Sequence, residues 1–268
     1  MKKLLFLLTI ISITIAAKAQ DSTGAKKSTK QEKRQERKQK INTMIRQDEE
    51  GIVGYRKQNI FGIKVSTLGY GLVYEIGRTK TTRKTTTYGI ELSELKNQKE
   101  EKLPTGGFIV GNRYIYGKIN NFYQFKLGIG QQYILGEKGN KNGVSVSAVY
   151  GAGLSLGFLR PYYLQVVDAS GNGLTIKYTP QDSLLFTGQT IVGSGGLGKG
   201  WGELKFKPGA YAKAGLRFDY GRFNEIVSAI EVGVSLEAYA QKIPIMLYQK
   251  DKQLFFQGYL ALEFGRRK

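Results

Sequence analysis

The sequence contains no cysteine and no histidine. Without cysteine there is no disulfide framework, no thiolate metal site and no residue for lipoprotein-type acylation after a signal. Without histidine the chain lacks the general base or proton relay of outer-membrane acyltransferases, deacylases, phospholipases and omptin-type proteases. We therefore predict a protein that is not an enzyme and uses no metal or other cofactor. A carboxylate-based reaction stays open, but its candidate acids are scattered: Asp168, Asp182, Glu203 and Asp219.

Long apolar runs are also missing after the first twenty residues. No later segment reaches the ~18 apolar residues of a transmembrane helix, so a membrane-spanning form of this chain must be a β-barrel. Residues 1–19 begin with Lys2 and Lys3, continue with an apolar run and end in Ala17-Lys18-Ala19. These are the features of a secretory signal peptide, so the mature chain is predicted to start at Gln20.

Acidic residues are in short supply. The chain has 41 lysines and arginines against 21 aspartates and glutamates, for a formal net charge of +20. An excess of this size favours anionic partners, namely lipopolysaccharide phosphates, anionic lipid or acidic glycans. Because the chain is predicted to be exported, we expect outer-membrane lipid, lipopolysaccharide and envelope proteins as partners, and no nucleic acid.

Residues 20–58 form a polar segment of mixed charge, which we interpret as a basic periplasmic arm. Good helix formers dominate from Lys30 to Arg46, and no apolar stripe begins before Ile41. A helix that is polar all round buries little, so the arm is either a solvated helix or disordered. It is either a linker after the signal or a segment that grips an acidic polymer or a partner. Its candidate partner-binding residues are Lys33, Arg34, Arg37, Lys38 and Lys40.

The segment from Val144 to Phe158 is the clearest structural signal in the chain. Every second residue is apolar, and those between are nearly all small or hydroxylated. A period of two predicts a β-strand with two different faces. The strand is much longer than a typical strand of a soluble protein, which has roughly five or six residues. An apolar face opposite a small, polar face is typical of a transmembrane barrel strand.

Further alternating segments predict an all-β fold, an antiparallel transmembrane β-barrel of about eight strands over residues 59–268. The other seven predicted strands are Phe61–Arg78 (bent), Thr86–Ser93, Arg113–Ile119, Asn121–Leu135, Leu204–Phe218, Ile226–Tyr239 and Phe256–Phe264. Separating Phe61–Ser66 would give nine strands, and a membrane-embedded hairpin at Tyr162–Tyr178 would give ten. A soluble sandwich or lipocalin-like barrel is the competing fold, but soluble strands expose charge on one face.

An even strand count leaves both barrel termini in the periplasm and places the long connection 160–203 outside the cell. This connection contains Gly193–Gly200, which matches GxxxxGK. A phosphate-binding loop also needs Ser or Thr after the lysine and a following helix, and both are missing from the pattern. We interpret it as a surface loop. The chain ends in Gly265-Arg-Arg-Lys268, a basic tail that can meet periplasmic or lipid phosphates.

Charged residues fall on the predicted inner face of the barrel. On two neighbouring strands these residues are Lys205, Lys207, Lys213, Arg217, Glu231 and Glu237, and on other strands Lys64, Glu75, Glu91, Lys126 and Glu263. Eight strands leave an interior just wide enough for side chains, so buried charges have to pair. The set is either a salt-bridged plug or a polar passage for a small anionic solute.

Several stretches resemble a group of uncharacterised outer-membrane β-barrel proteins from Bacteroidota. They are the signal ending AKAQ, GIKVSTLGYGLVYEIGR, YGIELSELKNQKEEK, NRYIYGKINNFYQFKLGIGQQ, KFKPGAYAKAGLRFDYG and AIEVGVSLEAYAQKIPIM. The resemblance covers Asn59 to Arg266. It implies a barrel in the outer membrane of a Gram-negative bacterium that works beside larger envelope assemblies. The predicted function is thus a non-enzymatic structural or accessory subunit, and the alternative is a small transport barrel or narrow pore for an anionic solute.

Overall fold

The computed structural model describes most of the chain after residue 55. The described residues are 34–35, 38–39, 56–81, 83–104, 113–139, 143–168, 170–188, 191–222 and 225–268. The predicted signal peptide, residues 1–19, and nearly all of the predicted arm lie outside them, including Lys33, Arg37 and Lys40. Arg34 and Lys38 are helical and exposed. None of the described helices is both long and apolar enough to cross a membrane.

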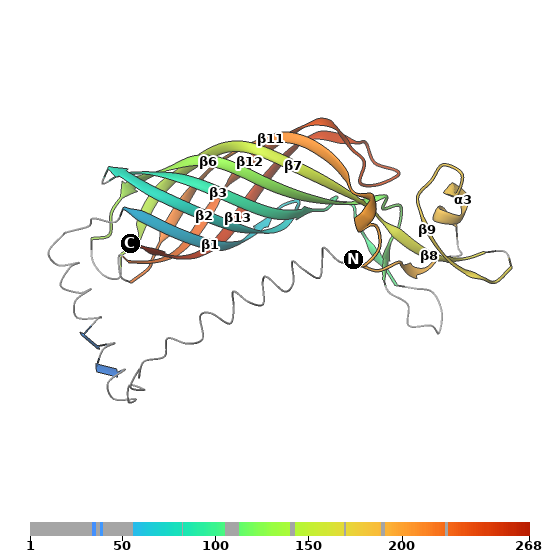
Figure 1. The fold of residues 1–268 in the computed structure, drawn as a ribbon, viewed down its shortest axis with the longest axis horizontal. Helices are drawn as coiled ribbons and strands as arrows, with labels where there is room; N and C mark the ends of the chain where they lie inside the picture. Colours follow the sequence, from blue (N-terminus) through green and yellow to red (C-terminus); the bar gives the residue numbers. More distant parts are fainter. Residues whose placement is uncertain are drawn as a thin grey trace, which may run out of the picture. The chain divides into compact units, whose positions relative to one another are not determined.

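Eight long antiparallel strands of the described chain close into a barrel (Figure 1). They are β1 (Lys57–Ser66), β2 (Gly69–Thr81), β3 (Lys84–Leu95), β6 (Asn120–Gly136), β7 (Ser145–Pro161), β11 (Lys205–Asp219), β12 (Ile226–Ile243) and β13 (Lys252–Arg267). The strand order is β1-β13-β12-β11-β7-β6-β3-β2, and β1 pairs with β13 to complete the ring. Closure removes the free edges of the sheet. The predicted fold class is therefore confirmed.

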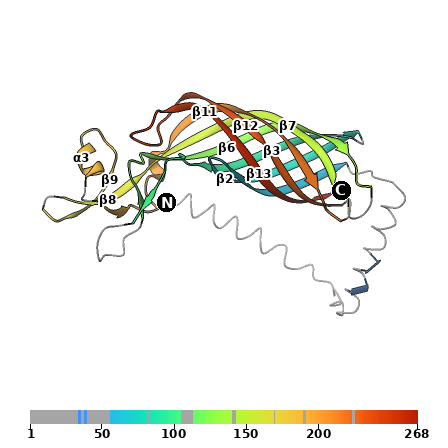
Figure 2. The ribbon, with the colours of Figure 1, turned by 180° about the vertical axis from the view of Figure 1, so that it is seen from behind.

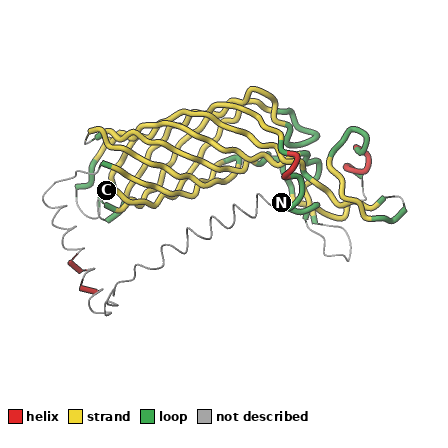
Figure 3. Tube along the Cα trace, in the orientation of Figure 1, coloured by secondary structure: helices red, strands yellow, loops and turns green. Residues whose placement is uncertain are grey.

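Alternation along each strand decides which side chains enter the barrel. In β2, Leu72, Tyr74 and Ile76 are exposed, whereas Val73 and Glu75 between them are buried. The apolar residues thus face outward and the polar ones face inward, which is the reverse of a soluble barrel. Figure 3 shows these strands winding obliquely around the barrel, as closure of a twisted sheet requires.

Two of the predicted strands are wrong. One of them is two strands and the other is not in the barrel, so the number of barrel strands is still eight. Phe61–Arg78 is not one bent strand, because Thr67 and Leu68 form a turn after which Gly69 pairs with Ser66. A two-residue turn of this kind joins two antiparallel strands. Arg113–Ile119 is not a barrel strand, because Gly117 has a left-handed φ of 67° and breaks the extended run.

The barrel has two different ends, visible in Figures 1 and 2. The terminal end carries the start of β1, the end of β13 and the connections 82–83, 137–144 and 220–225. The opposite end, called the loop end, carries the turn 67–68 and the connections 96–119, 162–204 and 244–251. The predicted external connection 160–203 therefore lies at the end opposite to both barrel termini.

An ordered extension, called the crown, is built from the connections at the loop end. It contains a three-stranded sheet of order β10-β8-β9, formed by β8 (Tyr163–Val167), β9 (Gly173–Lys177) and β10 (Ile191–Ser194). Beside it lie α3 (Ser183–Thr187), the 3-10 turn η1 (Trp201–Glu203), and the short pair β4 (Lys102–Leu103) and β5 (Tyr114–Ile115). Because β8 and β9 belong to a separate sheet, the hairpin does not add strands to the barrel.

The crown has its own apolar core and is fastened to the barrel by backbone hydrogen bonds. Leu164, Val166, Phe186 and Ile191 are buried together. The Ile119 amide donates to Ile245 O at 2.8 Å, which joins two connections of the loop end. The Asn120 amide of β6 donates to the same oxygen at 3.3 Å, which ties these connections to the barrel. These contacts make the crown an ordered platform rather than a set of independent loops.

Candidate functional site

The outer wall of the barrel is an apolar band. Large apolar side chains cover it on every strand, with Leu154 exposed by 69 % and Phe256 by 68 %. A continuous apolar surface of this extent is a membrane-contacting surface. A closed barrel can cross a bilayer because all of its backbone groups are paired between strands. The chain is thus an outer-membrane barrel, in contact with lipid over its wall.

The first of two charge clusters in the interior is centred on Arg217 of β11. Its fully buried guanidinium contacts three carboxylates: Glu75 Oε1 at 3.0 Å, Glu231 Oε2 at 2.7 Å and Glu263 Oε2 at 2.7 Å. Lys213 adds a second cation 3.4 Å from Glu231. The planar guanidinium has five N–H donors in a fixed geometry, so it can hydrogen-bond several carboxylates at once. We call these five residues the Arg217 group.

The second cluster lies nearer the loop end and is centred on Lys126 of β6. Lys126 pairs with Glu91 at 3.1 Å and with Glu237, and Glu91 also accepts from Lys64 at 2.7 Å. Gln124 donates to the carboxylate of Glu237. This Lys126 group (Lys64, Glu91, Lys126 and Glu237) holds equal numbers of cations and carboxylates, whereas the Arg217 group holds three carboxylates against two cations.

Apolar side chains close the interior on the loop-end side of these charges. Phe122, Tyr239 and Phe255 pack against one another with ring centroids 5.3–5.9 Å apart. The complete plug consists of buried Leu95, Phe122, Leu159, Tyr239, Ile243, Ile245 and Phe255. On the terminal side, Ile60, Val227 and Ala229 form a smaller apolar layer. The interior is therefore filled in layers.

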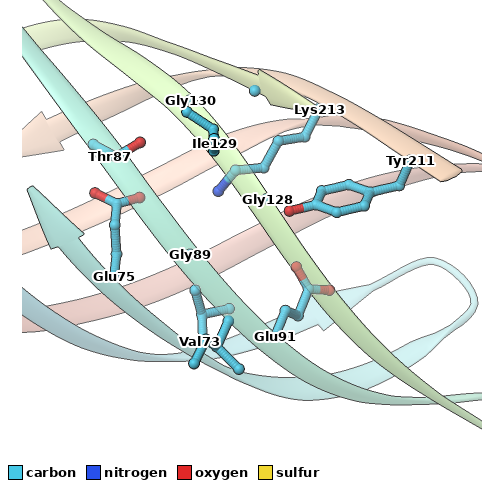
Figure 4. Close-up of a pocket in the computed structure, with 12 residues that line it drawn as sticks. Val73, Glu75, Thr87, Gly89, Glu91, Gly128, Ile129, Gly130, Tyr211 and Lys213 are labelled. Carbon is cyan, nitrogen blue, oxygen red and sulfur yellow. The ribbon is translucent and has the colours of Figure 1, made fainter. Parts of the chain in front are cut away.

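A small cavity of about 20 Å³ remains between the two charge clusters. Figure 4 shows Tyr211 and Lys213 entering it from β11, and Glu75 and Glu91 from β2 and β3. Glycines on β3, β6 and β7 form part of its wall. At Gly128 an added Cβ would lie 2.1 Å from the Tyr211 hydroxyl. The glycine leaves room for the ring. A cavity of this size holds roughly one water molecule and no larger solute.

The residues predicted for the lumen lie in two different places. Lys213, Arg217, Glu231 and Glu237 are in the two groups, but Lys205 is exposed and Lys207 is half-buried, donating to Gln241. The pairing of β11 with β12 ends at Gly209, so both lysines lie beyond that contact and pair only with β7.

Sequence reasoning missed several polar residues that complete the clusters. Tyr259 donates to Glu231 at 2.7 Å, Gln132 accepts from Arg217 at 3.3 Å, and Gln124 donates to Tyr239 at 2.6 Å. Their inward position could have been read from strand alternation, but their partners could not. No group of acids in the described chain is arranged to hold a metal ion.

Comparison with solved structures finds small outer-membrane barrels. Neisserial surface protein A has 11% identity and a TM-score of 0.36, covering 79% of this chain and 96% of its own. Ail, the attachment invasion locus protein of Yersinia pestis, has 12% identity and a TM-score of 0.35, and the match covers 80% of this chain and 100% of Ail. The N-terminal β-barrel domain of Pseudomonas aeruginosa OprF has 10% identity and a TM-score of 0.32, and the match covers 80% of this chain and 99% of that domain. No protein-family model and no curated protein sequence matches this chain.

Proposed function

We propose that this chain is a closed, non-enzymatic outer-membrane barrel that serves as a structural or accessory subunit of an envelope assembly. The filled interior is the observation that carries the proposal. The ionic groups and the apolar plug occupy the space that a solute would need, and an eight-stranded barrel has no spare width. A barrel with a filled interior acts through its surfaces, and the crown is an ordered surface outside the apolar band.

The crown is proposed as the partner-binding surface. Its core is buried, yet Leu184 of α3 is exposed by 87 % and Leu197 by 78 %. Trp201 is also exposed, and Arg160 stacks on its ring at 4.8 Å. Exposed apolar and aromatic side chains on an ordered scaffold are typical of protein interfaces. We also propose that this chain is one of the Bacteroidota outer-membrane barrels that its sequence resembles. In that case it works beside larger envelope assemblies.

The basic arm is proposed as a second contact, through Lys33, Arg34, Arg37, Lys38 and Lys40. The density of its positive charge supports an acidic polymer or protein as its partner. Residues 1–19 are proposed to act as the signal peptide that exports the chain.

Transport of an anionic solute is the weaker alternative. Lys205 and Lys207, two of the cations invoked for it, do not enter the ionic groups, and the Arg217 group has more carboxylates than cations. Neither feature favours passage of an anion.

Two measurements test the proposal. In a planar bilayer the purified full-length barrel is expected to show no conductance, and a steady conductance would contradict the proposal that the barrel is closed.

In the second measurement, a photo-crosslinking residue at position 184 of the crown is compared with one at exposed position 165 of β8. A discrete protein adduct from 184 that is absent from 165 is expected in intact outer membranes. Equal or absent labelling would contradict a role of this crown surface in an assembly.

A further inference from the structure

Three cations lie side by side on the outer wall at the terminal end of the barrel. Lys57 of β1 is the direct cross-strand partner of Arg78 on β2. On its other side, Lys57 and Lys268 exchange two backbone hydrogen bonds of 2.8 Å each. All three side chains are exposed. Since neighbouring strands are about 4.8 Å apart, the three charges start from positions within roughly 10 Å of one another.

Two further cations extend this row on the same face. Arg266 is two residues before Lys268, and Lys80 is two residues after Arg78, so strand alternation turns both outward, and both are exposed. We call these five residues the terminal basic patch: Lys57, Arg78, Lys80, Arg266 and Lys268.

The terminal basic patch has no acidic side-chain partner among the described residues. None of its five side chains forms an ion pair with a described acid. By contrast Arg267, which faces inward between two patch residues, pairs with Asp219 at 2.6 Å. Like charges placed directly opposite each other weaken a strand pair. The outward set is therefore arranged in a way that an anion from outside the chain would stabilise.

The height of the patch on the wall indicates which anion is available there. Ile76, two residues before Arg78, and Phe264, two residues before Arg266, are exposed apolar residues of the lipid-facing band. The cations thus begin where the apolar band ends, on the outward face of their strands. Lipid phosphates occupy this level of a bilayer, and basic side chains there bind anionic headgroups.

From this geometry we infer that the terminal basic patch is a binding site for the phosphate headgroup of an anionic phospholipid. The lipid belongs to the leaflet that meets the terminal end. One phosphate can bridge Lys57 and Arg78, and a lipid with two phosphates can also reach Lys268 or Arg266. This site is separate from the crown and does not depend on the proposed assembly function.

A second source of negative charge lies within the chain itself. Asp48, Glu49 and Glu50 precede Lys57 by a few residues in the sequence. If these acids occupied the patch, neutralising them would free it for lipid. The experiment therefore includes a variant in which all three are replaced by their amides.

The test measures binding of phosphatidylglycerol to the folded full-length barrel in phosphatidylcholine bicelles. The patch variant is Lys57→Gln with Arg78→Gln. The matched control is Lys99→Gln with Lys102→Gln, which removes two exposed charges from the crown, away from the bilayer wall. The patch variant is expected to bind about tenfold more weakly, because each basic residue near a membrane surface contributes several-fold to anionic lipid binding. The control is expected to bind as the parent does.

Three results would overturn the inference. One is an equal loss in patch and control variants, or no loss in either. Another is equally strong binding of free glycerol phosphate, which would make this a soluble-phosphate site. The third is a gain of lipid binding in the Asp48, Glu49 and Glu50 amide variant together with no loss in the patch variant. Native-like emission from Trp201 shows that each variant is folded.

Discussion

Replacing Arg217 with methionine is expected to destabilise the barrel more than any other single change in its ionic core. Arg217 is fully buried and is shared by Glu75, Glu231 and Glu263. Methionine fills a similar volume without the charge. The three carboxylates would then face only Lys213, which lies 3.4 Å from Glu231.

The size of the effect follows from leaving buried charges without their partner. Removing one side of a buried ion pair typically costs about 3–5 kcal/mol, because the remaining charge keeps its desolvation penalty. Arg217 serves three carboxylates, so we expect the upper part of that range. The matched control is Arg83→Met, since Arg83 is exposed at the terminal end. A surface change of this kind is expected to stay within about 0.5 kcal/mol.

The assay is equilibrium urea unfolding of the barrel in lipid vesicles. Trp201 is the chain's one tryptophan and stacks against Tyr123 at 5.7 Å and Arg160 at 4.8 Å, so its emission reports on the folded loop end. A loss below about 1 kcal/mol for Arg217→Met would refute the idea that these charges depend on one guanidinium.

The imbalance of the Arg217 group provides a companion test. Because this group has three carboxylates for two cations, Glu263→Gln removes a surplus negative charge and is expected to change stability by less than about 1 kcal/mol. Combined with Arg217→Met, it should recover part of the lost stability, with a coupling of about 0.5–3 kcal/mol. Strictly additive effects would contradict the shared network.

Further predictions concern close packing, the plug and the crown. Gly153→Ala is expected to lower the free energy of unfolding by about 1–3 kcal/mol, because the added Cβ would lie 2.1 Å from a backbone oxygen. At Gly89 the nearest atom is 4.0 Å away, so alanine should be tolerated there. Urea unfolding compares the two variants. Phe122→Ala is expected to cost about 3–5 kcal/mol in the same assay, since Phe122 is fully buried in the apolar plug. In the crown, Lys177 donates to Glu203 and lowers the pKa of that carboxyl, so Lys177→Gln should raise the pKa of Glu203 toward its ordinary value in an NMR titration. The pair stabilises the crown above the unfolded pKa of the carboxyl and is lost as the pH falls through the lower folded value, so an unchanged titration would contradict the contact.

Strand alternation made the barrel predictable from the sequence. The face on which Glu75, Arg217 or Glu263 lies depends only on its place along its own strand, because successive side chains of a strand point to opposite sides. The apolar wall, the polar interior and the antiparallel fold follow from that local rule. The outward position of Arg78 follows from it as well, whereas Lys57 and Arg266 lie outside the predicted strands and are placed in β1 and β13 only by the structure.

The strand boundaries were less predictable, because a turn and a bend give similar patterns. Residues 61–78 alternate across Thr67 and Leu68 almost without interruption, and only the pairing of Ser66 with Gly69 identifies a hairpin. Residues 113–119 also alternate, but the left-handed φ of Gly117 ends them. The alternation of apolar and polar residues shows which face of a strand each residue occupies. It does not show whether the chain continues as one strand or turns back in a hairpin.

The sequence alone thus determined the class of fold, the lipid-facing surface and the chemical character of the interior, since these depend on residues close together along the chain. Only the tertiary structure decided which charges meet. Arg217 contacts Glu75 across 142 residues and Glu263 across 46, and Lys57 lies beside Lys268 because β1 pairs with β13 to close the ring. Such contacts depend on strand order and register, which are set by the fit of all eight strands around one closed barrel.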